Sequence, residues 1–219
     1  MPRTVIIWRH GRTEWNLAGR VQGQTDVPLD DVGREQVRSA AARLASLRPN
    51  RILTSDLSRA RETAEELGRL AGVAVEADVR FRERSFGVRE GLTMAEAFDR
   101  FPEHMARWLA GDEAGIPGSE SSSAAGERFA AALNEHLETL GPDDTLVVVS
   151  HGGVTRAGAL CFLGLPREFW DSFGGLSNCS WAVLEERDLV PTKEAPWRVV
   201  EWNAGTLPEP VLSDEEPAG

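Results

Sequence analysis

The sequence predicts an α/β fold: a three-layer sandwich with a mostly parallel central sheet, one antiparallel edge strand, helices on both faces and a small helical cap. One observation behind this prediction is that strand-like and helix-like segments alternate along the chain. Another is that the runs Val5–Trp8 and Thr145–Val149 are apolar throughout, which is typical of central strands buried on both faces. The third is a late pair of strand-like segments, which we expect to be antiparallel neighbours.

The first half of the chain contains three strand-like and two helix-like segments, separated by polar or glycine-containing turns. In chain order they are strand Val5–Trp8, helix Asp31–Leu47, strand Arg51–Thr54, helix Asp56–Ala71 and strand Val73–Val75. The first helix shows apolar residues at helical spacing, and residue types that cap helices stand at the start of both. We expect Asp30 or Asp31 to cap the first helix and Ser55 or Asp56 to cap the second.

The second half begins with helical segments and returns to strands. The expected elements are helix Thr93–Leu109, broken near Pro102, helix Glu120–Leu140, strand Thr145–Val149, helix Gly153–Leu163, and strands Ser180–Glu185 and Trp197–Trp202. The pair Gly141-Pro142 is expected to end the long helix. We therefore expect one domain over residues 1–203, with a cap insertion at approximately 88–118. Residues 204–219 are acidic and contain prolines, and we expect a mobile tail there.

Composition excludes several classes of function. The chain has 219 residues, 41% of them hydrophobic and 27% charged, which is typical of a globular protein. No apolar run approaches the roughly 20 residues of a membrane span, and no signal peptide is visible. A net charge of −11 argues against a nucleic-acid partner. The two cysteines have no metal or redox spacing, which favours reduced thiols and a cytoplasmic protein. The late strands and tryptophans are compatible with a homodimer.

Two of the four histidines occupy the same local setting. His10 follows the first apolar strand, between Arg9 and Gly11, and His151 follows the strand Thr145–Val149 and Ser150. Parallel strands end at a common edge of the sheet, where ligands bind in such folds. Arg59, in the first turn of the second helix, is expected at this edge beside helix N-terminal amides. Arginine matches phosphate oxygens, and a neutral imidazole can attack phosphorus. These residues predict a phosphate pocket.

The same residues are compatible with other interpretations. Each histidine could merely end a strand, and paired histidines could bind a metal, although Arg9 and Arg12 would repel a cation and no HxxxH spacing exists. A dinucleotide enzyme would need a glycine-rich loop after its first strand. Glu83 and Glu90, in a glycine-punctuated loop, are both candidates for a proton donor, and composition alone does not choose between them. His136 is expected to be a surface or packing residue, and His104 to lie in the cap.

The segment RHGRTEWN, residues 9–16, resembles the RHGxTxWN signature of the histidine phosphatase superfamily, also called the phosphoglycerate mutase-like family. The segments QGQTDVPLDDVGREQ, TSDLSRARETA, RERSFGVREGLT and VVSHGGVTRA follow in that family's order. The resemblance implies that His10 is the nucleophile, that Glu83 protonates the leaving group, and that no metal or other cofactor is needed. It further implies that Arg9, Arg59, His151 and Asn16 hold the phosphoryl group.

The resemblance also suggests where the substrate binds and which reaction occurs. Further candidates for substrate or phosphate binding are Gln22, Gly23, Gly152, Arg84 and Glu120, and rim candidates are Arg12, Arg20, Arg89 and Arg156. Arg89 stands where the family commonly has an aromatic residue. A phosphatase is favoured over a cofactor-dependent mutase, whose Arg-His-Tyr-Gly segment is missing; a non-catalytic phosphate-binding relative is the remaining alternative. The segments FGGLSNCSWAVL and WRVVEWNAG resemble glucosyl-3-phosphoglycerate phosphatases. The substrate is therefore expected to be a small anionic phosphorylated metabolite.

Overall fold

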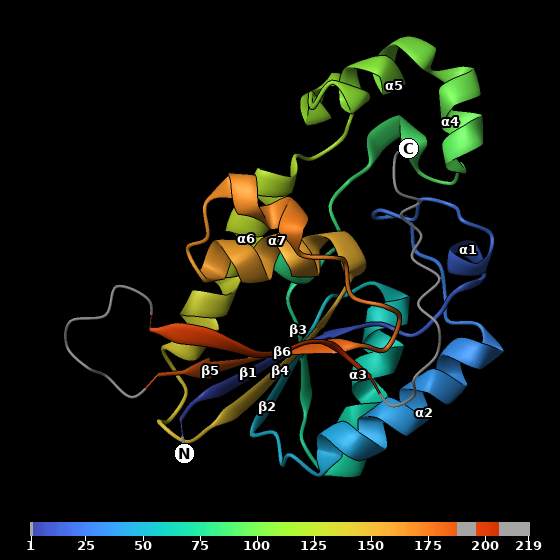
Figure 1. Ribbon diagram of the computed structural model, residues 1–219. Coiled ribbons are helices and arrows are strands. Elements are labelled where there is room, and N and C mark those ends of the chain that lie inside the picture. The colour runs from blue at the N-terminus through green and yellow to red at the C-terminus, as the bar shows by residue number, and fades with distance from the viewer. Residues whose placement is uncertain (1, 188–195, 206–219) are drawn as a thin grey trace.

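A six-stranded sheet forms the centre of the molecule, as the computed structural model shows for residues 2–187 and 196–205 (Figure 1). The strand order is β3-β2-β4-β1-β5-β6. The strands are β1 (Thr4–Arg9), β2 (Arg51–Thr54), β3 (Val75–Ala77), β4 (Thr145–Ser150), β5 (Trp181–Glu186) and β6 (Trp197–Ala204). The mostly parallel sheet predicted from the sequence is confirmed. Most of the acidic tail, residues 206–219, lies outside the described residues.

The direction of the strands follows from their pairing. The neighbours β3, β2, β4 and β1 are all parallel, whereas β5 pairs antiparallel with both β1 and β6. The strand that runs against the others is therefore β5, one place in from the edge. The last two strands are antiparallel neighbours, as expected.

Side chains of alternate strand residues build two separate cores, because successive residues of a strand point to opposite faces. Ile6 and Trp8 of β1 pack with α2 (Asp31–Ala45) and α3 (Ser58–Ala71). Val5 and Ile7 pack on the other face with α6 (Ser122–Leu137) and α7 (Gly152–Phe162). All four side chains are fully buried. The sheet is thus covered by helices on both faces, and the three-layer prediction is confirmed (Figure 1).

Several element ends differ from the sequence prediction, each for a local reason. Helix α3 begins at Ser58, and neither Ser55 nor Asp56 caps it. Instead the distant Asp26 accepts hydrogen bonds from the backbone N–H and hydroxyl of Ser58, at 2.8 and 2.7 Å. Asp56 is held by Arg82 in a two-bond ion pair. Helix α2 is capped by Asp30, one of the two residues predicted.

Two further boundaries are set by turns rather than by the apolar pattern. Gly72 is left-handed (φ 69°) and ends α3, and Val73 still donates its N–H to the helix carbonyl of Gly68, so β3 begins only at Val75. Helix α6 begins after its cap Ser121 and ends at Leu137, short of Gly141. The long helix is therefore two residues shorter at its start and three at its end than predicted.

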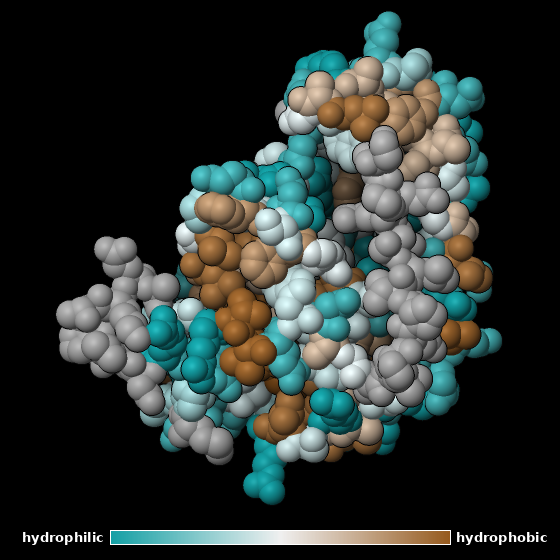
Figure 2. Space-filling view, viewed as in Figure 1, coloured by the Kyte–Doolittle hydropathy of each residue, from teal (hydrophilic) through white to brown (hydrophobic). Residues whose placement is uncertain are grey.

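A small cap is formed by α4 (Met94–Arg100) and α5 (Pro102–Leu109), with the break at Pro102 that the sequence predicts. The cap has its own apolar cluster, which includes Leu92, Met105 and Ile116. Short elements complete the chain: α1 (Glu14–Leu17), η1 (Val79–Phe81), η2 (Gly87–Arg89), η3 (Glu113–Gly115) and η4 (Arg167–Ser172). Figure 2 shows the surface hollowed between the cap and the body. None of the described helices is long and apolar enough to cross a membrane.

Candidate active site

The pairing of the two central strands brings His10 and His151 together. Arg9 of β1 is in register with Ser150 of β4, and each histidine is the next residue along its strand. The two imidazole rings lie 5.1 Å apart between centroids, in an edge-to-face arrangement. Both are buried, with 2% and 1% of their surface exposed. The prediction that both histidines emerge at one edge of the sheet agrees with this geometry.

Hydrogen bonds fix a different tautomer for each ring. The Nδ1 of His10 lies 2.7 Å from the carbonyl oxygen of Gly11. Because a carbonyl can only accept, this nitrogen carries the proton and Nε2 keeps its lone pair. The Nδ1 of His151 accepts from Nε of Arg59 at 3.1 Å, so its proton is on Nε2. That Nε2 is buried and has no acceptor among the described residues. The pair therefore offers one nucleophilic nitrogen and one N–H donor.

Burial and neighbouring cations keep both rings neutral. For His10, burial is the main reason that its pKa lies well below the ordinary 6.5, and Arg59 and Arg9 lower it further, against the hydrogen bond to Gly11. For His151 burial again dominates, followed by Arg59, with His10 and Arg9 adding to the lowering of the pKa. A neutral imidazole is the form that can attack phosphorus, and His10 is in that form.

These lowered pKa values predict how the rings titrate. Because each pKa lies below 6.5, both rings should stay neutral as the pH is lowered from 8 to 6.5, where an ordinary histidine is half protonated. NMR of ¹⁵N-histidine-labelled protein should show the Nδ1–H tautomer for His10 and the Nε2–H tautomer for His151. On the acid side of its pH profile, kcat/KM should accordingly fall with a midpoint below pH 6.5. A midpoint at or above 6.5 for either ring would contradict the assignment.

Two arginines supply the positive charge of the site. Arg59 is 1% exposed and donates to His151, to the carbonyl of Thr25 at 2.9 Å and to that of Gly23 at 2.8 Å. A guanidinium has five N–H donors, so two remain without an acceptor among the described residues. Burial lowers its pKa to about 10, which still leaves it charged at neutral pH. Arg9 donates from Nη1 to the carbonyl of Leu176 at 2.6 Å.

Glu83 lies at the N-terminus of α7, the helix for which His151 is the N-cap. Its Oε1 accepts from the backbone N–H groups of Arg84 (2.8 Å) and Val154 (2.7 Å), and its Oε2 accepts from that of Gly153 (2.9 Å). A Cβ on Gly153 would come within 3.0 Å of Oε1, so glycine is needed for this approach. Glu83 and His151 are thus held by the same helix end.

The helix amides expected to bind phosphate have a different partner. The N–H groups of Gly153 and Val154 bind Glu83, and that of Ser58 in α3 binds Asp26. Carboxylates of the chain itself therefore use the positive ends of both helices. An anion at this edge of the sheet would therefore have to be bound mainly by side chains.

Comparisons with known proteins agree with this geometry. The family model "Histidine phosphatase superfamily (branch 1)" matches residues 5–204. This chain belongs to the histidine phosphatase superfamily. A glucosyl-3-phosphoglycerate phosphatase of Mycolicibacterium vanbaalenii is 35% identical over 92% of this chain and 95% of its own. A probable phosphoglycerate mutase, GpmB of Yersinia enterocolitica, is 34% identical over 90% of this chain and 89% of its own.

A solved structure gives the same result for the fold. A mycobacterial glucosyl-3-phosphoglycerate phosphatase in complex with VO3 superposes on this histidine phosphatase with a TM-score of 0.84, at 33% identity. The match covers 93% of this chain and 100% of the other. The predictions of the family, of its α/β fold and of a phosphatase are thereby confirmed.

Three further predicted site residues of this histidine phosphatase have contacts that bear on ligand binding. Asn16 accepts at Oδ1 from Thr13 and from Asn178, which leaves its Nδ2 without an acceptor among the described residues. Gln22 is buried, and its Oε1 has no described donor. A Cβ on Gly152 would lie 3.2 Å from Cζ of Arg9, so this glycine lets the guanidinium approach the start of α7.

Gly23 and Glu90 together shape the loop that holds Arg59. Gly23 has φ +55°, and a Cβ on it would overlap Glu90. The carboxylate of Glu90 accepts from the backbone N–H groups of Gln24 (3.2 Å), Thr25 (3.1 Å) and Phe86 (3.0 Å), and from the Thr25 hydroxyl (2.8 Å). Glu90 is therefore a tie between two loops. Of the two candidate acids, Glu83 is the one that shares a helix end with His151.

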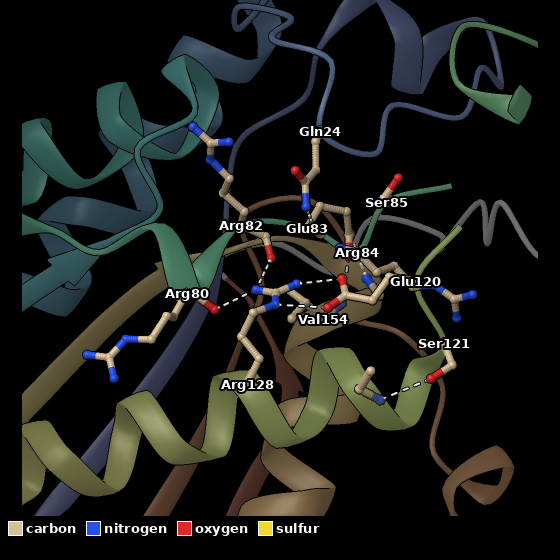
Figure 3. A network of polar contacts seen from close by, with 12 residues as sticks. Gln24, Arg80, Arg82, Glu83, Arg84, Ser85, Glu120, Ser121, Arg128 and Val154 are labelled. Carbon is tan, nitrogen blue, oxygen red and sulfur yellow. Dashed lines mark hydrogen bonds and ion pairs between the residues drawn. The ribbon is translucent and has the colours of Figure 1, made fainter. Parts of the chain in front are cut away.

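Glu120, a predicted substrate-binding residue, forms a two-bond ion pair with Arg128 at 3.0 and 2.7 Å (Figure 3). Arg128 also donates to the carbonyls of Arg80 and Arg82, which precede the acid Glu83. The pair thus supports the loop that carries Glu83. Among the rim candidates, Arg12 pairs with Asp30, Arg20 with Glu96, and Arg156 donates to the carbonyl of Phe173.

Sequence reasoning named Arg84 but missed Arg128 and Asn178 as site residues. Asn178 donates from Nδ2 to the carbonyl of His10 at 3.1 Å and to Oδ1 of Asn16 at 3.2 Å. It therefore fixes the backbone of His10 and the side-chain amide of Asn16. The signal was its place in the segment FGGLSNCSW. Arg128 lies in the middle of α6 and carries no local signal.

The remaining histidines have structural partners. His136 is buried and its Nε2 lies 3.1 Å from Oδ2 of Asp78, which agrees with the packing role expected for it. His104 in the cap contacts the carbonyl of Gly115 through Nδ1 at 2.9 Å. Among the described residues, no group of three or more His, Cys, Asp or Glu side chains could hold a metal ion.

Proposed function

We propose that this histidine phosphatase hydrolyses phosphomonoesters through a phosphohistidine on Nε2 of His10, without a metal or other cofactor. The observation that carries the proposal is the pair of opposite tautomers: a buried lone pair on His10 beside a buried N–H donor on His151, next to Arg9 and Arg59. A nucleophile, a donor and fixed positive charge are the parts that phosphoryl transfer requires.

The proposed reaction has two steps. In the first, the Nε2 lone pair of His10 forms a bond to phosphorus while the P–O bond to the alcohol breaks, and Glu83 gives its proton to the leaving oxygen. In the second, Glu83 removes a proton from water, the water oxygen attacks phosphorus, the N–P bond breaks and phosphate leaves. A carboxylate offers about four lone-pair positions, and three accept backbone N–H groups here. The fourth, on Oε2, is the one we assign to proton transfer.

Side chains from several elements are proposed to hold the phosphoryl oxygens. These are Nε2–H of His151, the two remaining donors of Arg59, the guanidinium of Arg9 and Nδ2 of Asn16. The N–H of Gly152 adds a donor from the start of α7. All are in place before substrate binds, and such preorganised donors stabilise the charge that develops in the transition state.

For the substrate we propose glucosyl-3-phosphoglycerate or a closely related sugar or glycerate phosphate. The support is the similarity to phosphatases of that name, and the buried Oε1 of Gln22, which can accept a hydrogen bond from a substrate hydroxyl. Arg84, directly beside Glu83, is proposed to lie on the leaving-group side of the site.

A panel of substrates tests the proposal. Phosphate release should be measured without added metal and with a chelator, on glucosyl-3-phosphoglycerate, 3-phosphoglycerate, sugar phosphates, a nucleotide and p-nitrophenyl phosphate. We expect chelator-insensitive release, with the highest kcat/KM for glucosyl-3-phosphoglycerate. Conversion of 3-phosphoglycerate to 2-phosphoglycerate with a bisphosphorylated primer, without phosphate release, would instead establish a mutase. Phosphate binding with neither reaction would indicate a non-catalytic relative.

The cellular setting is also a proposal. We propose a cytoplasmic protein that acts on a small molecule, with no nucleic acid or membrane partner, and that forms a homodimer. Light scattering on the purified protein would test the dimer, because a monomer mass at micromolar concentration would exclude it.

A further inference from the structure

Two buried arginines lie around one aromatic ring beside the cap. The guanidinium carbons of Arg84 and Arg89 lie 5.1 and 5.2 Å from the ring centre of Phe86, and that of Arg89 lies 5.1 Å from the ring centre of Trp108. Only 7% of Arg84 and 3% of Arg89 is exposed. Stacking on aromatic rings holds a guanidinium by its faces and leaves its N–H edge free for an acceptor.

The N–H groups of this pair are not satisfied by the described residues. Nε and Nη2 of Arg84 and Nε of Arg89 are buried without a described acceptor. Arg84 uses only Nη1, which donates to the hydroxyl of Ser122 and, at 3.3 Å, to Glu113. Glu113 also accepts the backbone N–H and the hydroxyl of Ser122, at 2.6 and 2.7 Å. Glu113 is thus shared among Ser122, Arg84 and, at 3.8 Å, Arg167, and it forms no described ion pair with Arg89.

Such a pair is costly to the fold. Burying a cation without a partner is unfavourable, and two like charges add to the cost. The pKa of Arg89 reflects this, because burial and then Arg84 lower it to about 10, against Glu113. Arg89 also stands at the position where the resemblance leads us to expect an aromatic residue. If position 89 had only a structural role, an aromatic residue would serve it better than an unpaired charge.

We propose that Arg84 and Arg89 form a second anion-binding site, which holds an oxyanion group of the substrate other than the phosphate that is cleaved. This inference rests on the proposed function and adds a specificity determinant to it. The backbone N–H of Arg84 donates to Glu83, the proposed acid, and its side chain reaches Ser122 and Glu113, so the pair is connected to the loop of the acid rather than to His10. A carboxylate or second phosphate on the alcohol part of the substrate is the group that fits.

Binding to the inactive variant His10→Ala separates this site from turnover. Dissociation constants should be measured by calorimetry for 3-phosphoglycerate, for glycerol 3-phosphate, which lacks the carboxylate, and for 1,3-propanediol bisphosphate. The two ligands with a second anion should bind about 10–100-fold more tightly than glycerol 3-phosphate. Adding Arg89→Met to this variant should remove most of that advantage and leave the dissociation constant of glycerol 3-phosphate unchanged. An advantage for only one of the two would show whether the site takes a carboxylate or a phosphate.

A matched control is Arg107→Met, which removes one exposed arginine from the same cap, where it pairs with Asp112. It should leave all three dissociation constants within about two-fold, because exposed ion pairs contribute little. The Tm of Arg89→Met should not fall, because an unpaired buried charge is lost. The proposal would be overturned if Arg89→Met weakened the binding of all three ligands equally and lowered the Tm. It would also be overturned if Arg89→Met left the advantage of the two doubly anionic ligands unchanged, or if no ligand bound to the His10→Ala protein. If the wild type released phosphate from no substrate while the advantage persisted, the proposed function would fail and this site would stand.

Discussion

Replacing His10 with alanine is expected to reduce kcat for phosphate release by about 10⁴-fold or more, the size of effect found when a covalent nucleophile is removed. No other described side chain is in position to replace it, since the second ring, His151, has its lone pair occupied by Arg59. The His10 backbone should keep its place, because its N–H binds the carbonyl of Ser150 and its carbonyl accepts from Cys179 and Asn178. The fold should therefore survive the substitution.

Rapid mixing with a phosphate-labelled substrate, followed by alkaline quench, provides the second measurement. Wild type should retain label that is stable to base and lost in acid, the behaviour of a phosphohistidine, and His10→Ala should retain none. His136→Ala is a suitable control, because it changes a buried histidine that pairs with Asp78 outside the proposed site. Label on His10→Ala, or a loss of rate below about ten-fold, would show that another group is the nucleophile.

Replacing Glu83 with glutamine is expected to lower kcat by about 10²–10⁴-fold for an alkyl phosphate, the usual contribution of a general acid and base. The loss in the first step should be much smaller for p-nitrophenyl phosphate, because p-nitrophenolate can leave without a proton. A burst of p-nitrophenol equal to the enzyme concentration should then precede slow turnover, since hydrolysis of the phosphohistidine still needs a base. The amide also places an NH₂ group against a backbone N–H, which should cost about 1–3 kcal/mol of the free energy of unfolding.

Glu90→Gln is the matched control for this variant. Glu90 accepts as many backbone N–H groups as Glu83 does, from Gln24, Thr25 and Phe86, and should lose comparable stability. Any loss of kcat in Glu90→Gln should be the same for the alkyl phosphate and for p-nitrophenyl phosphate, and no burst of p-nitrophenol should appear. If Glu83→Gln behaved like Glu90→Gln, the role of Glu83 would be limited to joining its loop to α7.

The position of the catalytic histidines could be predicted from the sequence because it depends on local pattern and one general rule. Apolar runs locate β1 and β4, and parallel neighbours end at a shared edge, so His10 and His151 must meet. The choice between Glu83 and Glu90 could not be made, because both are acids in one loop and differ only in which distant N–H groups they meet.

Other features escaped prediction because their partners are far apart in the chain. The start of α3 depends on Asp26, which lies 32 residues before Ser58. The support of the Glu83 loop depends on Arg128, which reaches carbonyls 46 and 48 residues away. Arg84 and Arg89 are candidates for substrate contact in the sequence, but only folding shows that both are buried and that Arg89 lies against Trp108 of the cap. Periodicity carries no information about such long-range contacts.

The cap has an apolar cluster of its own, separate from the two cores on the sheet. The groups assigned to the chemistry are anchored elsewhere, on β1, α3, α7 and the Glu83 loop. We therefore expect substitutions in the cap to leave the proposed phosphoryl-transfer groups in place while changing which alcohol is accepted. A division of this kind would let the substrate preference change through substitutions in one small region of the chain.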